Sequence, residues 1–201
     1  LVEYKMDGGT PGIFGWYASG DDGNVKNGSE RMPTISGCGN FMSFMGDGNY
    51  GWSSDGSLYD RNMTYAGTWG IGLRGHDMSF VEDLKHSFRV AYWGGTNSPK
   101  MAKYVSDYAA YDKRGVSSVV ETGFGYDPVY LTTEDYALEV GLTNTYKMYD
   151  NFTVMLDAAY LALWLDDSRS TWGKNPMRGF SGKDGGVYDA WNVNLSFVYS
   201  F

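Results

Sequence analysis

The sequence contains little cysteine, few prolines and no long apolar run. Its 201 residues include one cysteine and five prolines, so Cys38 has no partner within the chain for a disulfide or a cysteine metal cluster. The longest apolar run, Ala158 to Leu165, is far shorter than the roughly 20 residues of a transmembrane helix. Acidic residues outnumber basic ones by 24 to 16, and this balance argues against binding to a nucleic-acid backbone.

Glycine and aromatic residues are abundant instead. The chain has 28 Gly, 17 Tyr and 7 Trp, and 42% of its residues are hydrophobic. This composition excludes disorder and favours strands and turns over helices. A closed β-barrel also satisfies every backbone polar group in lipid, and its strands give only a weak hydropathy signal. Alternation of side chains is therefore the pattern to test.

Apolar and polar side chains alternate along the last segment. Because successive side chains on a strand point to opposite faces, the segment predicts a strand with one apolar face and one small, polar face. Only Val198 breaks the pattern. The apolar positions are Trp191, Val193, Leu195, Phe197, Tyr199 and Phe201, and the polar positions are Asn192, Asn194, Ser196 and Ser200.

Two longer segments, 136–147 and 152–164, alternate in the same way around the predicted tight turn at 148–151. A shift of one residue would turn Glu139 and Lys147 toward the apolar side, at a cost of about 2–4 kcal/mol for a lysine at the middle of a bilayer. Shorter alternating segments occur at 2–6, 65–74 and 87–92, and the facing of a further segment, 13–19, is ambiguous. We therefore expect about seven strands.

Long connections alternate with short turns between these strands. The long ones, at 20–64, 95–134 and 166–188, are rich in Gly, Asp, Asn and Ser, whereas the turns near 8–12, 81–85 and 148–151 are short. This rhythm is typical of an outer-membrane barrel with long external loops and short periplasmic turns. The predicted fold is an all-β, antiparallel transmembrane β-barrel that forms a single domain over residues 1–201.

The expected strand number also indicates whether this chain forms a whole barrel or part of one. Bacterial single-chain barrels have an even number of strands with both termini in the periplasm, so seven strands predict the carboxyl-terminal part of a larger barrel. A complete barrel of eight strands remains an alternative if one long loop contains a further strand.

Two stretches resemble segments of the homotrimeric outer-membrane porins of sulfate-reducing bacteria: TPGIFGWYASGDDGNVKNGSERMP and YKMYDNFTVMLDAAYLALWLDD. The end of the chain is similar to the carboxyl-terminal assembly signal of outer-membrane proteins. The resemblance implies a passive channel for small hydrophilic solutes and ions, assembled as a homotrimer in outer-membrane lipid, without a cofactor or a reaction. The barrel's first half and its constriction loop have no counterpart here. The residues that the barrel-assembly machinery would read are Leu195, Phe197, Tyr199 and Phe201.

The alternation predicts which polar side chains point into the lumen. Rings of charged side chains set the selectivity of pores, so these residues are candidates for contact with solutes, with solvation or cross-linking of the inner wall as the alternative. Acidic loops would favour cations at the mouth. The candidates are Glu3, Lys5, Arg74, Arg89, Glu139, Thr143, Thr145, Lys147, Asp157, Asn192, Asn194 and Ser196.

Aromatic residues near the strand ends are candidates for the girdles that mark the two membrane interfaces, whereas in a soluble protein they would form the core. They are Tyr4, Tyr65, Trp69, Tyr136, Tyr146, Trp164, Trp191 and Tyr199. Within one long loop, Ser98 and Pro99 begin a stretch of helical periodicity that extends to Lys113, so a short helix is expected there.

Catalytic and metal-binding sets are weaker alternatives. His76, Asp77 and Ser79 lie close in sequence, with His86 beyond them, but neighbours on a strand point apart and cannot converge on a substrate. We therefore expect no enzyme, and keep a barrel enzyme and a soluble β-sandwich binding module as alternatives. Oxygen ligands for calcium occur in three groups, for which Asx turns are the competing explanation. The groups are Asp21, Asp22 and Asn24; Asp47 and Asn49; and Asp166 and Asp167.

Overall fold

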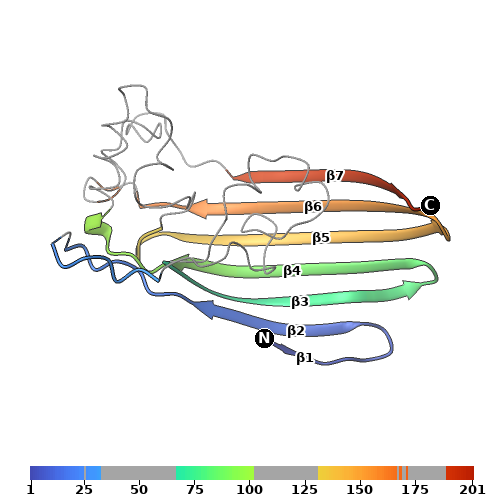
Figure 1. Cartoon of the computed structure of the whole chain (residues 1–201), viewed down its shortest axis with the longest axis horizontal. Coiled ribbons are helices and arrows are strands. Elements are labelled where there is room, and N and C mark those ends of the chain that lie inside the picture. Colours follow the sequence, from blue (N-terminus) through green and yellow to red (C-terminus); the bar gives the residue numbers. More distant parts are fainter. Residues whose placement is uncertain (25, 33–66, 102–130, 167, 169–170, 172–188) are drawn as a thin grey trace, which may run out of the picture.

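A computed structural model describes residues 1–24, 26–32, 67–101, 131–166, 168, 171 and 189–201. Its strands form one antiparallel sheet of seven in the order β1 to β7 (Figure 1), so the prediction of an all-β antiparallel fold is confirmed. Within the described residues, helix is confined to residues 99–101. The strands are β1 Val2–Glu3, β2 Thr10–Tyr17, β3 Thr68–Val81, β4 Leu84–Gly95, β5 Tyr136–Tyr149, β6 Phe152–Trp164 and β7 Ala190–Tyr199.

Every strand pairs with its neighbours in sequence. The turns that join β1 to β2, β3 to β4 and β5 to β6 lie at one end of the sheet, where the chain also ends, and the long connections leave from the opposite end (Figure 1). We call these the turn end and the loop end. The turn between β3 and β4 is short because Asp83 adopts a positive φ of 61°, which Asp tolerates better than most residues.

The register of β5 and β6 follows directly from their alternation. Val140 lies opposite Tyr160, Leu138 opposite Ala162, and the same pairing continues along both strands. Apolar side chains therefore meet apolar side chains on one face, and Glu139 points to the other.

Several strand boundaries differ from the expectation: β2 covers Thr10–Tyr17 rather than 13–19, and β4 covers Leu84–Gly95 rather than 87–92. The first strand covers only Val2–Glu3 rather than 2–6, followed by an isolated bridge between Met6 and Gly9. β3 continues beyond Arg74 to Val81, with register shifts after Gly75. Asp77 has a positive φ of 51° there, as expected of a β-bulge. The bulge interrupts the period of two, so the sequence pattern alone ended this strand too early.

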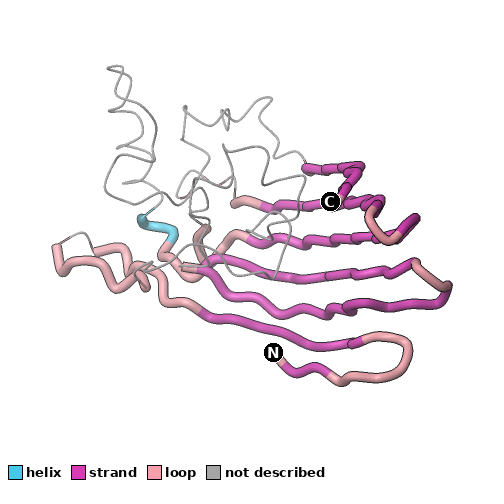
Figure 2. The backbone as a smooth tube through the Cα atoms, turned by 45° about the vertical axis from the view of Figure 1, so that its right-hand side comes forward, coloured by secondary structure: helices cyan, strands magenta, loops and turns pink. Residues whose placement is uncertain are grey.

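The described strands form an open sheet, in which β1 and β7 are the two edges (Figure 2). Among the described residues, no helix is long and apolar enough to span a bilayer.

A small apolar core lies against one face of the sheet near the loop end. It consists of Phe14, Ala91, Trp93, Leu131 and Ala137, and the side chains packed against it are Trp16, Leu161, Leu163 and Leu165. Phe14 is buried and Ile13 is exposed, which resolves the ambiguous facing of β2.

Candidate functional site

The face opposite this core is apolar and exposed over the whole width of the sheet. We call it the apolar face. Register pairs such as Leu73 with Val90 and Ala158 with Val193 place its side chains next to one another across the strands. Its exposed members include Ile13, Ile71, Leu73, Phe88, Tyr92, Val140, Leu142, Leu156, Tyr160, Trp191, Val193, Leu195, Phe197 and Tyr199. Exposed apolar patches of this extent mark surfaces that contact a partner or a membrane.

Aromatic rings gather at both ends of the apolar face, and the residues between them are mostly aliphatic, with the rings of Phe88 and Tyr160 among them. At the loop end Tyr92 packs edge-on against Trp69 at 5.8 Å and stacks on Tyr136 at 6.0 Å. At the turn end Phe152 stacks on Phe197 at 6.2 Å. The predicted girdle residues that belong to described strands all lie on this face. They are Trp69, Tyr136, Tyr146, Trp164, Trp191 and Tyr199.

One polar pair interrupts the apolar face. His86 on β4 lies opposite Asn144 on β5, and Nδ1 of His86 is 2.6 Å from Oδ1 of Asn144. Because an amide oxygen only accepts, the imidazole donates this hydrogen bond. The alternation of β5 fails at Asn144, so this pair is a feature that the sequence analysis missed.

The opposite face, which we call the charged face, carries ionisable side chains at the middle of the strands. The Arg74 guanidinium contacts Oε1 of Glu3 through Nη2 at 2.7 Å and Nε at 2.8 Å. Arg89 lies next to Arg74 on β4 and interacts electrostatically with Glu139 and Asp157. Thr143 also donates a hydrogen bond to Asp157 at 2.7 Å. Arg89, Glu139 and Asp157 are buried, so this group cross-links β4, β5 and β6.

Neutral polar groups also line the charged face. Thr145, Asn192, Asn194 and Ser196 share this face and are half-buried. Lys147 lies at the rim, where it donates to Asp150 at 2.8 Å. Lys5 is exposed in the turn between β1 and β2. All the predicted lumen residues within strands therefore share one face, and their role as pore lining stays a prediction.

At the loop end, buried polar residues tie the strand ends together. Asn97 donates to the carbonyl oxygen of Leu131 at 2.6 Å and accepts from the backbone N–H of Asp21 at 3.1 Å. Asp135 accepts from the backbone and hydroxyl of Thr132 at 2.7 and 2.8 Å. The bonds of Asn97 join the residues that follow β2 and β4 to Leu131, and those of Asp135 fix the segment just before β5.

Asp166, which follows β6, extends this network. Its backbone N–H donates to Asp135 at 2.9 Å. Its carboxylate accepts from the hydroxyls of Ser168 at 2.7 Å and Thr171 at 2.6 Å. These hydrogen bonds hold the pKa of the Asp166 carboxyl below its usual range because they favour the ionised form.

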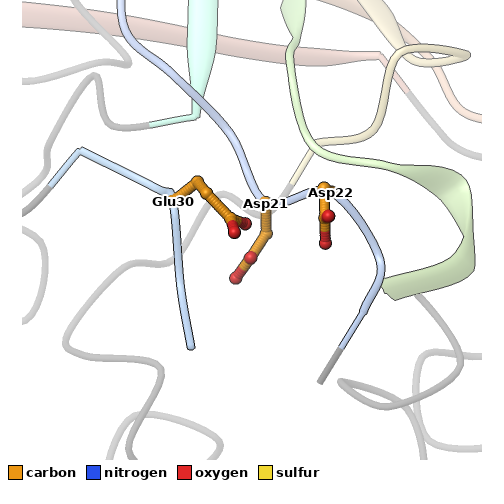
Figure 3. A group of neighbouring side chains, drawn as sticks. All are labelled: Asp21, Asp22 and Glu30. Carbon is orange, nitrogen blue, oxygen red and sulfur yellow. The ribbon is translucent and has the colours of Figure 1, made fainter. Parts of the chain in front are cut away.

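Asp21 and Asp22, two members of the first predicted calcium group, form a cluster of carboxylates after β2 with Glu30, which the sequence analysis did not include, whereas Asn24 is not a member. Asp21, Asp22 and Glu30 have oxygen atoms within 4.8 Å of one another (Figure 3). Asn27 donates to Asp22 at 3.2 Å and to Glu30 at 2.7 Å, and the backbone N–H of Asn24 donates to Asp22 at 2.7 Å. The local hydrogen bonds are those of Asx turns.

The histidines do not share a site. His76 lies opposite Thr10 on the charged face, whereas His86 lies on the apolar face. Asp77 forms an ion pair with Lys85 at 3.4 Å. Ser79 donates to the carbonyl oxygen of Val81 at 3.1 Å. The described geometry therefore brings none of these side chains together as a nucleophile with its base.

The remaining predictions fall partly outside the described residues. Residues 99–101 are helical, as the cap at Ser98 predicted, and the rest of the predicted helix lies outside that part of the chain. So do Asp47, Asn49, Tyr65 and Asp167. Of the predicted assembly signal, Leu195, Phe197 and Tyr199 are exposed on the apolar face of β7, and Phe201 follows them, exposed, with its ring 5.6 Å from that of Tyr199.

No protein-family model, curated protein or solved structure matches the chain. The resemblance to porins therefore stays a prediction from the sequence.

Proposed function

We propose that this chain forms part of the wall of an outer-membrane β-barrel and acts as a porin, through which small hydrophilic solutes and ions diffuse passively. The observation that carries the proposal is the exposed apolar face, whose mostly aliphatic middle lies between two sets of aromatic rings. Lipid chains would cover the middle of this face, and the amphipathic rings would lie at the headgroups.

The spacing of the aromatic rings fits the thickness of a bilayer. On β5, Tyr146 lies ten residues beyond Tyr136, which is about 34 Å along a strand at about 3.4 Å per residue. A tilt of about 40° reduces this length to roughly 26 Å of depth, close to the apolar band of about 25 Å on outer-membrane barrels. β3 and β6 have similar lengths of 14 and 13 residues.

The charged face supports an aqueous interior. Arg89 pairs in register with Gly141, the residue halfway between Tyr136 and Tyr146, and Arg74 pairs with Arg89. Charges at that depth are tolerated only on the side away from lipid. In the proposed barrel they would face the lumen, together with the hydroxyl and amide groups of the same face.

The arrangement of connections supports an orientation. Long connections at one end and short turns at the other match external loops and periplasmic turns. In a closed barrel the edges β1 and β7 pair with one another or with further strands. The proposal includes the homotrimer and the recognition of the last residues by the barrel-assembly machinery, both of which rest on the sequence resemblance.

Electrical recording tests the proposal directly. The full chain, purified in detergent and added to a planar lipid bilayer, is expected to produce stepwise increases in current. Absence of such steps at every voltage, or a chain that stays monomeric and soluble without detergent, would contradict it. The second outcome would favour a soluble sheet that binds a ligand.

A labelling experiment tests which face meets lipid. In a Cys38→Ser background, a nitroxide on Val193→Cys is expected to collide with oxygen dissolved in lipid, and one on the neighbouring Asn194→Cys with a water-soluble nickel complex. Equal access of the nickel complex to both positions would refute the assignment of the faces.

A further inference from the structure

The charges of the charged face differ in their access to water. Arg89, Glu139 and Asp157 are 9%, 0% and 3% exposed, so they contact other protein groups. The side chains of Arg74 and Glu3 keep 15% and 30% of their surface exposed. Of these five charges, Glu3 and Arg74 are therefore the two that a passing ion can approach.

The ion pair depends on a glycine between its partners. Glu3 on β1 and Arg74 on β3 are not neighbours, because Gly12 on β2 separates them in register. A Cβ atom at Gly12 would lie 2.7 Å from Cγ of Glu3. The missing side chain leaves room for Glu3 to lie across β2, where Arg74 holds it with two nitrogen atoms at 2.7 and 2.8 Å.

We propose that the Glu3–Arg74 ion pair sets the charge selectivity of the pore. This inference rests on the proposed function. In the intact pair the carboxylate and the guanidinium offset each other, so neither cations nor anions are favoured at this point. Removal of either partner leaves a single charge beside the path of the ions. The remaining charge attracts ions of opposite sign and raises their local concentration.

Reversal potentials test the proposal. The full chain is recorded in a planar bilayer that separates two concentrations of KCl, and the cation-to-anion permeability ratio is compared among variants. Glu3→Gln is expected to lower the ratio about threefold and Arg74→Gln to raise it about threefold, the size expected of one unit charge several ångströms from an ion in water. The double variant Glu3→Gln/Arg74→Gln is expected to return to the wild-type ratio.

A charge-conserving variant guards against loss of folding. Arg74→Lys keeps a cation at the site and is expected to conduct with the wild-type ratio. If the channel conducts but both single variants keep the wild-type ratio, or both shift it in the same direction, this inference is wrong and the porin proposal stands. If the wild-type chain produces no current, the porin proposal itself fails.

Discussion

An arginine in place of Val140 tests whether lipid covers the apolar face. Val140 is 39% exposed and lies four residues beyond Tyr136 on β5. At a tilt of about 40° it would lie roughly 10 Å inside the hydrocarbon. Arginine at the middle of a bilayer destabilises a barrel by about 2–4 kcal/mol. On a water-exposed sheet the same change would alter stability by about 0.5 kcal/mol or less, because the aliphatic stem can cover its neighbours.

The assay is urea unfolding of the chain folded into lipid vesicles, followed by tryptophan fluorescence. Two further arginines on β5 serve as controls. Thr145→Arg, on the charged face, is expected to change the free energy of unfolding by less than about 1 kcal/mol. Tyr146→Arg, at the expected interface, should cost about 0–1 kcal/mol for its charge. The reasoning would be refuted if Val140→Arg changed the free energy of unfolding by less than about 0.5 kcal/mol, or if Thr145→Arg lowered it as much as Val140→Arg does.

Two other changes probe particular hydrogen bonds. His86→Leu leaves the Asn144 amide without its imidazole partner on an apolar surface and should lower the free energy of unfolding by about 1–3 kcal/mol, whereas His86→Leu/Asn144→Leu should be nearly neutral; equal losses in both variants would contradict the pairing. The Asp166 carboxyl has a pKa below its ordinary 3.8 because Ser168 and Thr171 donate to it, so its stabilisation is present above that value and lost as the pH falls through the lowered pKa. In Asp166→Asn, the free energy of unfolding should therefore fall less steeply as the pH is lowered, as measured by unfolding at a series of pH values. The same dependence on pH in the variant and the wild type would show that the carboxylate contributes nothing.

The strands with a sustained period of two were predictable from the sequence. In β6, and in β5 apart from Asn144, apolar residues at every second position determine both the face and the register, because a shift of one residue would exchange the faces. The carboxyl end of β3 was not predictable. The bulge at Asp77 has no signature in the sequence, and the residues beyond it lose the period of two.

The polar network at the loop end also escaped the sequence analysis. Asn97 bonds to the backbone of Asp21, 76 positions away, and to that of Leu131, 34 positions away. Such partners are set by how the strand ends meet in space, and a local pattern carries no information about them. Likewise the alternation placed Glu139 and Arg89 on one face, but it did not indicate that other protein groups bury them.

The alternation along a strand identifies which side chains share a face of the sheet, whereas the exposure of those side chains indicates which environment suits that face. On β7, Trp191, Val193, Leu195 and Phe197 are 74%, 55%, 58% and 64% exposed. Complete burial of a large apolar side chain stabilises a protein by about 1.5–3 kcal/mol. In water, these four side chains would therefore forgo roughly 3–8 kcal/mol of stabilisation that their burial would give. The whole stability of a typical domain is about 5–15 kcal/mol. Six other strands share the same face, while Glu139 and Asp157 are buried on the opposite one. A sheet built for water would bury its apolar side chains and expose its carboxylates, and this inverted distribution is the physical reason to expect hydrocarbon against the apolar face.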